Sequence, residues 1–193
     1  MGNKAPPRSY CAALLRTESP RGILMSDVPD QHRAEAPRTV RCAVITVSDT
    51  RTLQTDTGGQ TIVDLLTAAG HSVVQRHILR DEPAPMRELL ETLRQDPEVD
   101  AILMTGGTGL GSRDQTFETV SGLLDKPLPG YGELFRMLSY HQIGAAAMLS
   151  RAAGGLLGRK VLLTMPGSRG GILLSMEKLI LPELGHLVRE ARR

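Results

Sequence analysis

The sequence predicts an α/β fold in which a mostly parallel central sheet lies between two layers of helices. Two observations predict it. Short β-branched runs alternate along the chain with segments whose apolar residues recur at helical spacing, which is typical of a parallel sheet covered on both faces. The run 99–104 is also apolar at nearly every position, which indicates a strand buried on both sides.

The first half of this domain is expected to contain three strands and two helices. The β-branched run 40–47 ends in Ser48 and Asp49, which predicts a buried strand followed by a loop. A helical stripe of apolar residues then stops at Gly70, a typical helix end. The expected elements are strands at 40–47, 72–79 and 99–104, and helices around 62–69 and 86–93.

The second half is expected to contain helices and one hairpin. Residues 114–124 are predicted to form a helix, and the break at 129–132 begins another that extends through Leu138. Two apolar runs, 145–152 and 160–165, are predicted to pair as a hairpin that extends the sheet. The closing segments, 173–181 and 184–188, are predicted as helices.

The N-terminal region differs from the rest of the chain. Prolines punctuate residues 1–37 and no periodicity persists there, so a disordered or loosely docked extension is expected, followed by a folded domain at 38–193. No apolar run approaches the ~18 residues that a membrane span needs, and none resembles a signal peptide core. A cytoplasmic protein without a membrane partner is therefore expected.

The composition argues against several kinds of site. The net charge is +2 and its excess lies in the first 40 residues, so the body lacks the basic surface that binds nucleic acid. Aromatic residues make up only 3%, which disfavours base-stacking surfaces. The histidines show no metal-ligand spacing, and Cys11 and Cys42 form no CxxC pair, so neither zinc nor a disulfide is expected.

A glycine-rich loop follows the third predicted strand. It consists of Thr105, Gly106, Gly107, Thr108 and Gly109. Glycines allow positive φ and a close approach to a ligand, and consecutive N–H groups in such a loop bind anions. Because ligands bind at the carboxyl ends of parallel strands, the loop predicts a phosphate site. The simpler interpretation is a strand-to-helix turn, which seldom needs so many glycines.

The same loop resembles the nucleotide fingerprint of extended short-chain dehydrogenases. That fingerprint follows the first strand of its fold, whereas two strand–helix units precede the loop here. Those enzymes also use a Tyr-x-x-x-Lys pair, and no tyrosine of this chain has a lysine four positions later. A nucleotide-dependent oxidoreductase is therefore disfavoured. The loop is not a P-loop either, because no Gly-Lys-Ser/Thr follows it.

Three acidic residues are expected at this edge of the sheet. Asp49 and Asp81 follow predicted strands, and Asp114 begins a predicted helix. Carboxylates beside phosphates are typical ligands of hydrated Mg²⁺, so Asp81 and Asp114 are candidate metal ligands. Simpler explanations stay open: an Asx turn or helix cap for Asp49, a solvated turn for Asp81 and an N-cap for Asp114.

Several short motifs occur in one order along the chain. They are ITVSDT at 45–50, DTGGQ at 56–60, TGGTG at 105–109, SRDQTFE at 112–118, PGYGELFR at 129–136, LSRA at 149–152 and MPGS at 165–168. The series resembles the MogA/MoaB molybdopterin-binding family of molybdenum cofactor biosynthesis, from about residue 40 to the C-terminus. The stretch 138–144 is more similar to the MoaB branch.

The resemblance implies a three-layer α/β fold and a nucleotidyltransferase reaction, the Mg-ATP-dependent adenylylation of molybdopterin with release of pyrophosphate. It implies that Asp81 and Asp114 act in catalysis and hold Mg²⁺. The nucleotide phosphates are expected at the glycine loop and Asp49. Molybdopterin is expected to contact Ser112, Arg113, Ser150, Arg151, Gly167 and Ser168.

The resemblance also implies partners and leaves one alternative open. A homotrimer, or in the MoaB branch a homohexamer, is expected, and other proteins of the pathway are candidate partners. The alternative is a non-catalytic molybdopterin binder or carrier of the same pathway. The presence of both Asp81 and Asp114 favours the adenylyltransferase.

Overall fold

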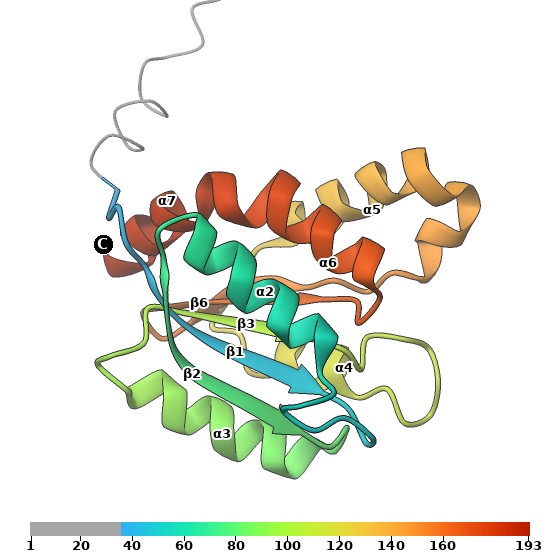
Figure 1. Cartoon of the computed structure of the whole chain (residues 1–193), viewed down its shortest axis with the longest axis horizontal. Coiled ribbons are helices and arrows are strands. Elements are labelled where there is room, and N and C mark those ends of the chain that lie inside the picture. The colour runs from blue at the N-terminus through green and yellow to red at the C-terminus, as the bar shows by residue number, and fades with distance from the viewer. Residues whose placement is uncertain (1–35) are drawn as a thin grey trace, which may run out of the picture.

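The computed structural model describes residues 36–193. Most of the extension predicted at 1–37 lies outside the described residues, as does Cys11. The described chain forms a six-stranded sheet with helices on both faces (Figure 1), which confirms the predicted α/β fold. Within this part of the chain, no helix combines the length and the apolar character that crossing a membrane requires.

The sheet is parallel at its centre and antiparallel at one edge. Its strands are β1 (Arg41–Val47), β2 (Ser72–Leu79), β3 (Ala101–Thr105), β4 (Lys126–Pro127), β5 (Gly154–Leu157) and β6 (Lys160–Met165). Their order in space is β2-β1-β3-β6-β5-β4. The pairs β1–β2, β1–β3 and β3–β6 are parallel, whereas β5 runs antiparallel to both β6 and β4.

Helices connect the strands and close the chain. They are α2 (Thr57–Ala68), α3 (Pro83–Gln95), α4 (Thr116–Ser121), α5 (Pro129–Ile143), α6 (Arg169–Ser175) and α7 (Leu181–Arg192), with the 3₁₀ helix η1 (Gly144–Leu149) after α5 and the π-helical segment η2 (Met176–Ile180) between α6 and α7. The predicted helix stop at Gly70 is confirmed, because α2 ends just before it and Gly70 has a φ of 83°.

Alternating side chains divide the core into two layers. Along β1, Cys42 and Val44 belong to the layer that packs on α2, α5, α6 and α7, whereas Ala43 and Ile45 belong to the layer that packs on α3 and α4. Figure 1 shows α2, α5, α6 and α7 on one face of the sheet and α3 on the other. Because the central strands are covered on both faces, charged groups gather at the strand ends.

The second half of the chain differs from the prediction at one strand. Residues 145–152 begin in the 3₁₀ helix η1, and the hairpin partner of β6 is β5. The three successive alanines at 145–147 favour helix over strand. Gly154 and Gly155 fit the hairpin because a Cβ would lie 2.4 Å from the Leu163 side chain and 2.3 Å from the Lys126 carbonyl oxygen, respectively.

An ion-pair cluster lies at the other end of the sheet, where the parallel strands begin. Asp100 is only 6% exposed and accepts hydrogen bonds from the backbone and guanidinium of Arg41 and from Arg192 of α7. Burial raises the pKa of Asp100, but the hydrogen bonds from the two arginines outweigh burial and lower that pKa to about 2. These ion pairs therefore link the starts of β1 and β3 to α7.

We predict that Asp100→Asn lowers stability in a pH-dependent manner. The pKa of Asp100 is about 2 in the folded chain and about 3.9 in an unfolded one, so its contribution is complete above about pH 4 and disappears as the pH falls toward 2. Urea unfolding near neutral pH should show a loss of about 2 kcal/mol. The same loss at about pH 3 would contradict the ion-pair explanation.

Candidate functional site

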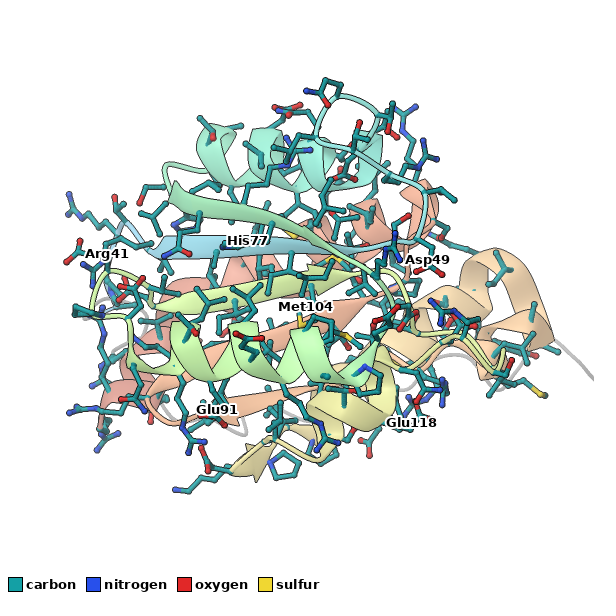
Figure 2. The ribbon with its side chains drawn as sticks, turned by 90° about the horizontal axis from the view of Figure 1, so that it is seen from below. Arg41, Asp49, His77, Glu91, Met104 and Glu118 are labelled. Carbon is teal, nitrogen blue, oxygen red and sulfur yellow. The ribbon has the colours of Figure 1, made fainter. Side chains whose placement is uncertain are left out.

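Three loops meet where the parallel strands end. Asp49 follows β1 and Asp81 follows β2, and the N–H of Asp81 donates to the Asp49 carboxylate at 3.2 Å. From the loop after β3, the N–H of Gln115 donates to Oδ1 of Asp81 at 2.9 Å. Figure 2 shows Asp49 and Glu118 at this end of the sheet, with Arg41 at the opposite end. The loops expected at one edge are therefore in contact.

Two positions of the glycine loop have a backbone conformation that favours glycine. Gly106 and Gly107 have φ values of 95° and 63°, in a region that other residues rarely adopt. A Cβ on Gly106 would also lie 2.3 Å from the carbonyl oxygen of Val47. A Cβ on Gly107 would lie 2.3 Å from both the Asp81 carboxylate and the Thr116 hydroxyl. Backbone conformation and space thus both require glycine here.

The loop is fixed at its ends and leaves amides free between them. The N–H of Gly106 donates to the last carbonyl of β6 at 3.2 Å, and the carbonyl of Gly107 accepts from Thr116 at 3.0 Å. Among residues 36–193, the amides of Gly107, Thr108 and Gly109 donate no hydrogen bond. Successive free N–H groups in such a loop form a concavity suited to phosphate.

Asp114 packs against this loop and does not cap a helix. Its Oδ2 accepts from the N–H of Gly111 at 2.9 Å, and a Cβ on Gly109 would come within 2.7 Å of the same oxygen. The helix predicted at 114–124 is limited to α4, and Gln115 occupies its N-cap position. The N-cap explanation of Asp114 is therefore wrong.

Burial and neighbouring charges shift the pKa values of Asp81 and Asp49 in opposite directions. Burial raises the pKa of Asp81, and the nearby carboxylates of Asp114 and Asp49 raise it further. The Arg113 guanidinium donates to both oxygens of Asp49 at 2.9 Å and lowers the pKa of Asp49. Asp81 is therefore a buried carboxylate beside like charges, which a bound cation would stabilise.

Asp81 and Asp114 fit a magnesium ion that is held mainly by the phosphates of a bound substrate. No group of three or more His, Cys, Asp or Glu that could hold a metal occurs within the described range, 36–193. Mg²⁺ is, however, usually bound by one or two carboxylates together with substrate phosphates and waters. Both carboxylates contact the loop whose free amides suit those phosphates. The two residues therefore fit Mg²⁺ that arrives with a phosphate-bearing ligand.

Asp56 is an acidic residue of the site to which the sequence analysis assigned no role. It caps α2 by accepting from the N–H of Gly59 at 2.9 Å, and it also accepts from the Thr46 hydroxyl at 2.8 Å and from Arg76 at 3.0 Å. Burial raises the pKa of Asp56, but these hydrogen bonds outweigh burial and lower it. An Asp ahead of a helical stripe is an N-cap signal, which could have identified Asp56.

Two clefts open beside the glycine loop. The larger, about 370 Å³, lies between the end of β1, the start of α2 and the start of α6, and its polar lining includes Ser48, Arg51, Asp56, Thr57, Thr61 and Arg169. The second, about 310 Å³, is bordered by the loop, Asp114 and Ser150. Gly106 and Gly167 line both clefts, so the two clefts adjoin at these glycines.

The residues predicted to contact molybdopterin fall into separate groups. Ser150 and Gly167 line the second cleft, and Ser150 meets Ser168 in an adjoining cavity of about 130 Å³. Neither Ser112 nor Arg113 lines any of these three spaces. Arg113 lies instead on the acidic side of the site, paired with Asp49.

Arg151, which follows Ser150, binds the glycine loop itself. Its Nε donates to the carbonyl of Thr108 at 3.0 Å, and its Nη2 donates to the carbonyl of Gly109. Its Nη1 pairs with Glu118 of α4. In the described chain, these contacts direct the guanidinium at the loop and α4.

Comparison with known proteins identifies relatives over most of the chain. The family model described as a probable molybdopterin binding domain matches residues 43–186. Molybdenum cofactor biosynthesis protein B of Bacillus cereus is 50% identical over 164 residues, which cover 84% of this chain and 97% of that protein.

Solved structures share the fold. A crystal structure of a molybdenum cofactor biosynthesis protein B superposes with a TM-score of 0.79 at 51% identity and covers 82% of this chain and 99% of that one. The tungsten cofactor synthesizing protein MoaB of Pyrococcus furiosus superposes with a TM-score of 0.72 at 33% identity and covers 82% of this chain and 100% of that one.

We predict that Gly106→Ala and Gly107→Ala each destabilise the domain, because a methyl group has no space there and positive φ is strained. Thermal unfolding should show a loss of more than about 2 kcal/mol for each variant. Gly130→Ala is the matched control, since a Cβ on Gly130 in α5 meets nothing within 4 Å, and it should be neutral or slightly stabilising. Wild-type stability of Gly106→Ala would contradict the loop conformation.

Proposed function

We propose that the chain acts in molybdenum cofactor biosynthesis as a molybdopterin adenylyltransferase, because it belongs to the family of molybdopterin-binding domains. The reaction would transfer AMP from ATP to molybdopterin and release pyrophosphate. The observation that carries the proposal is the glycine loop, whose free amides border the second cleft beside the carboxylates of Asp81 and Asp114, and whose Gly106 lines both clefts. A cytoplasmic location stays a prediction.

Each substrate is assigned to one cleft. The larger cleft presents Arg51 and Arg169, whose guanidinium groups suit the phosphates of a nucleotide. We therefore assign ATP to it, with phosphates that extend past Gly106, which lines both clefts, to the free amides of the glycine loop. We assign molybdopterin to the side of Ser150. The reacting phosphates of both would then meet near Gly106 and Gly167, which line both clefts.

The reaction needs positioning more than it needs a strong base. A terminal phosphate oxygen of molybdopterin would attack the α-phosphorus of ATP, and a new P–O bond would form while the bond to pyrophosphate breaks. That oxygen is already anionic near neutral pH, so no histidine base is required. The loop amides would stabilise negative charge on the reacting phosphates, and Mg²⁺ held by Asp81 and Asp114 would neutralise further charge.

We predict that the purified chain, given molybdopterin and Mg-ATP, forms adenylylated molybdopterin and pyrophosphate. Asp81→Asn and Asp114→Asn should each slow turnover by at least about 100-fold, because each removes a charge that holds the metal beside the phosphates. Glu88→Gln, which removes an exposed carboxylate of α3 away from the site, is the control and should leave turnover unchanged. Pyrophosphate release over time is the measurement.

Other outcomes point to other functions. Tight molybdopterin binding without turnover under any condition would support the carrier. Binding of a nicotinamide dinucleotide without ATP binding would support an oxidoreductase. Full activity of both aspartate variants would contradict the assignment of Asp81 and Asp114 to the metal.

We also propose that copies of the chain assemble through α5 and η1. Large apolar side chains, each at least 47% exposed, follow one another along these two elements: Leu134, Met137, Tyr140, Ile143, Met148 and Leu149. Monomeric proteins rarely expose a large contiguous apolar surface. A homotrimer or homohexamer would cover this one, and because Leu149 also lines the second cleft, the contact between copies would border the site.

We predict that Met137→Glu converts this oligomer into monomers, because a charge at a side chain 51% exposed on α5 leaves the fold intact but cannot be buried between copies. Light scattering at micromolar concentration is the measurement. Leu53→Glu, at a residue 54% exposed outside α5 and η1, is the control and should keep the oligomer. A monomeric wild-type protein would contradict the proposed assembly.

A further inference from the structure

Arg151 contacts the glycine loop but lines none of the three spaces beside it. Its Nε and Nη2 donate to the carbonyls of Thr108 and Gly109. Arg151 does not line the 310 Å³ cleft that the loop borders, although its neighbour Ser150 does. The planar guanidinium presents its donors in a fixed arrangement, so this one side chain holds two successive carbonyls of the loop.

The hydrogen bonds from Arg151 to these carbonyls also orient the neighbouring amides of the loop. In a planar trans peptide, the C=O of one residue and the N–H of the next point in opposite directions. Since the carbonyl of Thr108 is turned toward Arg151, the N–H of Gly109 is turned away from Arg151, to the side of the cleft that Gly109 lines. A loop this rich in glycine has many other conformations open to it, so its amides need such an anchor.

Arg151 is itself held in place by α4. Its Nη1 pairs with Glu118, and its guanidinium carbon lies 5.0 Å from the centre of the Phe117 ring. The hydrogen bond from Arg151 lowers the pKa of Glu118, so Glu118 is ionised near neutral pH. The side chain of Arg151 is only 18% exposed. The loop is thus connected through one guanidinium to the helix that follows it.

We propose that Arg151 is a positioning residue that anchors the glycine loop at Thr108 and Gly109, holds the Gly109 amide toward the substrate phosphates and does not itself bind molybdopterin. This differs from the role that the family resemblance implies for Arg151. The inference rests on the proposed adenylyl transfer for its kinetic consequences. Its consequence for the order of the loop can be measured without turnover.

The first experiment measures the order of the loop by NMR relaxation of the Gly107 and Gly109 amides in the full chain. Arg151→Met should lower their order parameters and weaken binding of Mg-ATP, measured by calorimetry, by at least about 10-fold. Arg94→Met is the matched control, because Arg94 also binds a carboxylate through its guanidinium, with both oxygens of Asp125 at 2.8 Å, but at the opposite end of the sheet. Arg94→Met should change neither the order parameters of the loop amides nor the binding of Mg-ATP. Unchanged loop order in Arg151→Met would overturn the proposal.

The second experiment separates positioning from direct contact. A positioning role predicts that kcat falls by about 100-fold in Arg151→Met while the KM for molybdopterin changes little. A raised KM at unchanged kcat would instead show direct contact with the pterin and overturn the proposal. A wild-type chain without turnover would reject the adenylyl transfer, whereas the NMR result would still decide the role of Arg151.

Arg151→Lys tests whether the charge alone is sufficient. Lysine keeps the charge but cannot present two donors in one plane to two carbonyls, so this variant should resemble Arg151→Met. Full recovery of loop order and kcat with lysine would overturn the proposal. Since lysine preserves charge and most of the side-chain volume, Arg151→Lys carries the test if Arg151→Met does not fold, as judged by circular dichroism.

Discussion

Burial of the central strands on both faces is the constraint on which the rest of the structure depends. Cys42 and Val44 of β1 enter one apolar layer, and Ala43 and Ile45 enter the other, so the middle of the sheet has no place for a charged group. Charges gather where the strands end. The same close packing brings the Gly106 backbone against the carbonyl of Val47, so the geometry of the phosphate loop follows partly from the packing of β1 against β3.

Much of the fold and the position of the site could be predicted, because the relevant signals are local. Strand runs, helical stripes and the stop at Gly70 need only neighbouring residues, and parallel topology then brings Asp49 and Asp81 to one edge. Ordered motifs indicated the family, which the match over residues 43–186 confirms. The segment 145–152 was predicted wrongly, because a short apolar run is compatible with strand and helix alike.

The direction of individual side chains could not be predicted. Arg151 reaches the carbonyl of Thr108 across 43 positions of sequence, and Arg113 reaches Asp49 across 64. Such contacts depend on how loops from different strands pack together, which no local pattern encodes. Arg113 therefore lies beside the acidic residues, although the resemblance had grouped it with the pterin site, and Asp56 was left without a role despite its cap signal.

The sheet order also determines when the site can form during synthesis. β6 is the last strand of the chain, yet it lies between β3 and β5, so an emerging polypeptide exposes one edge of β3 until residues beyond 160 have left the ribosome. Pairings between strands so distant in sequence form slowly. Since the N–H of Gly106 is held by the final carbonyl of β6, the loop takes its shape only after β6 has been synthesised and has paired with β3. A truncated nascent chain would therefore have no formed site, and its open strand edge would be available to chaperones or to aggregation.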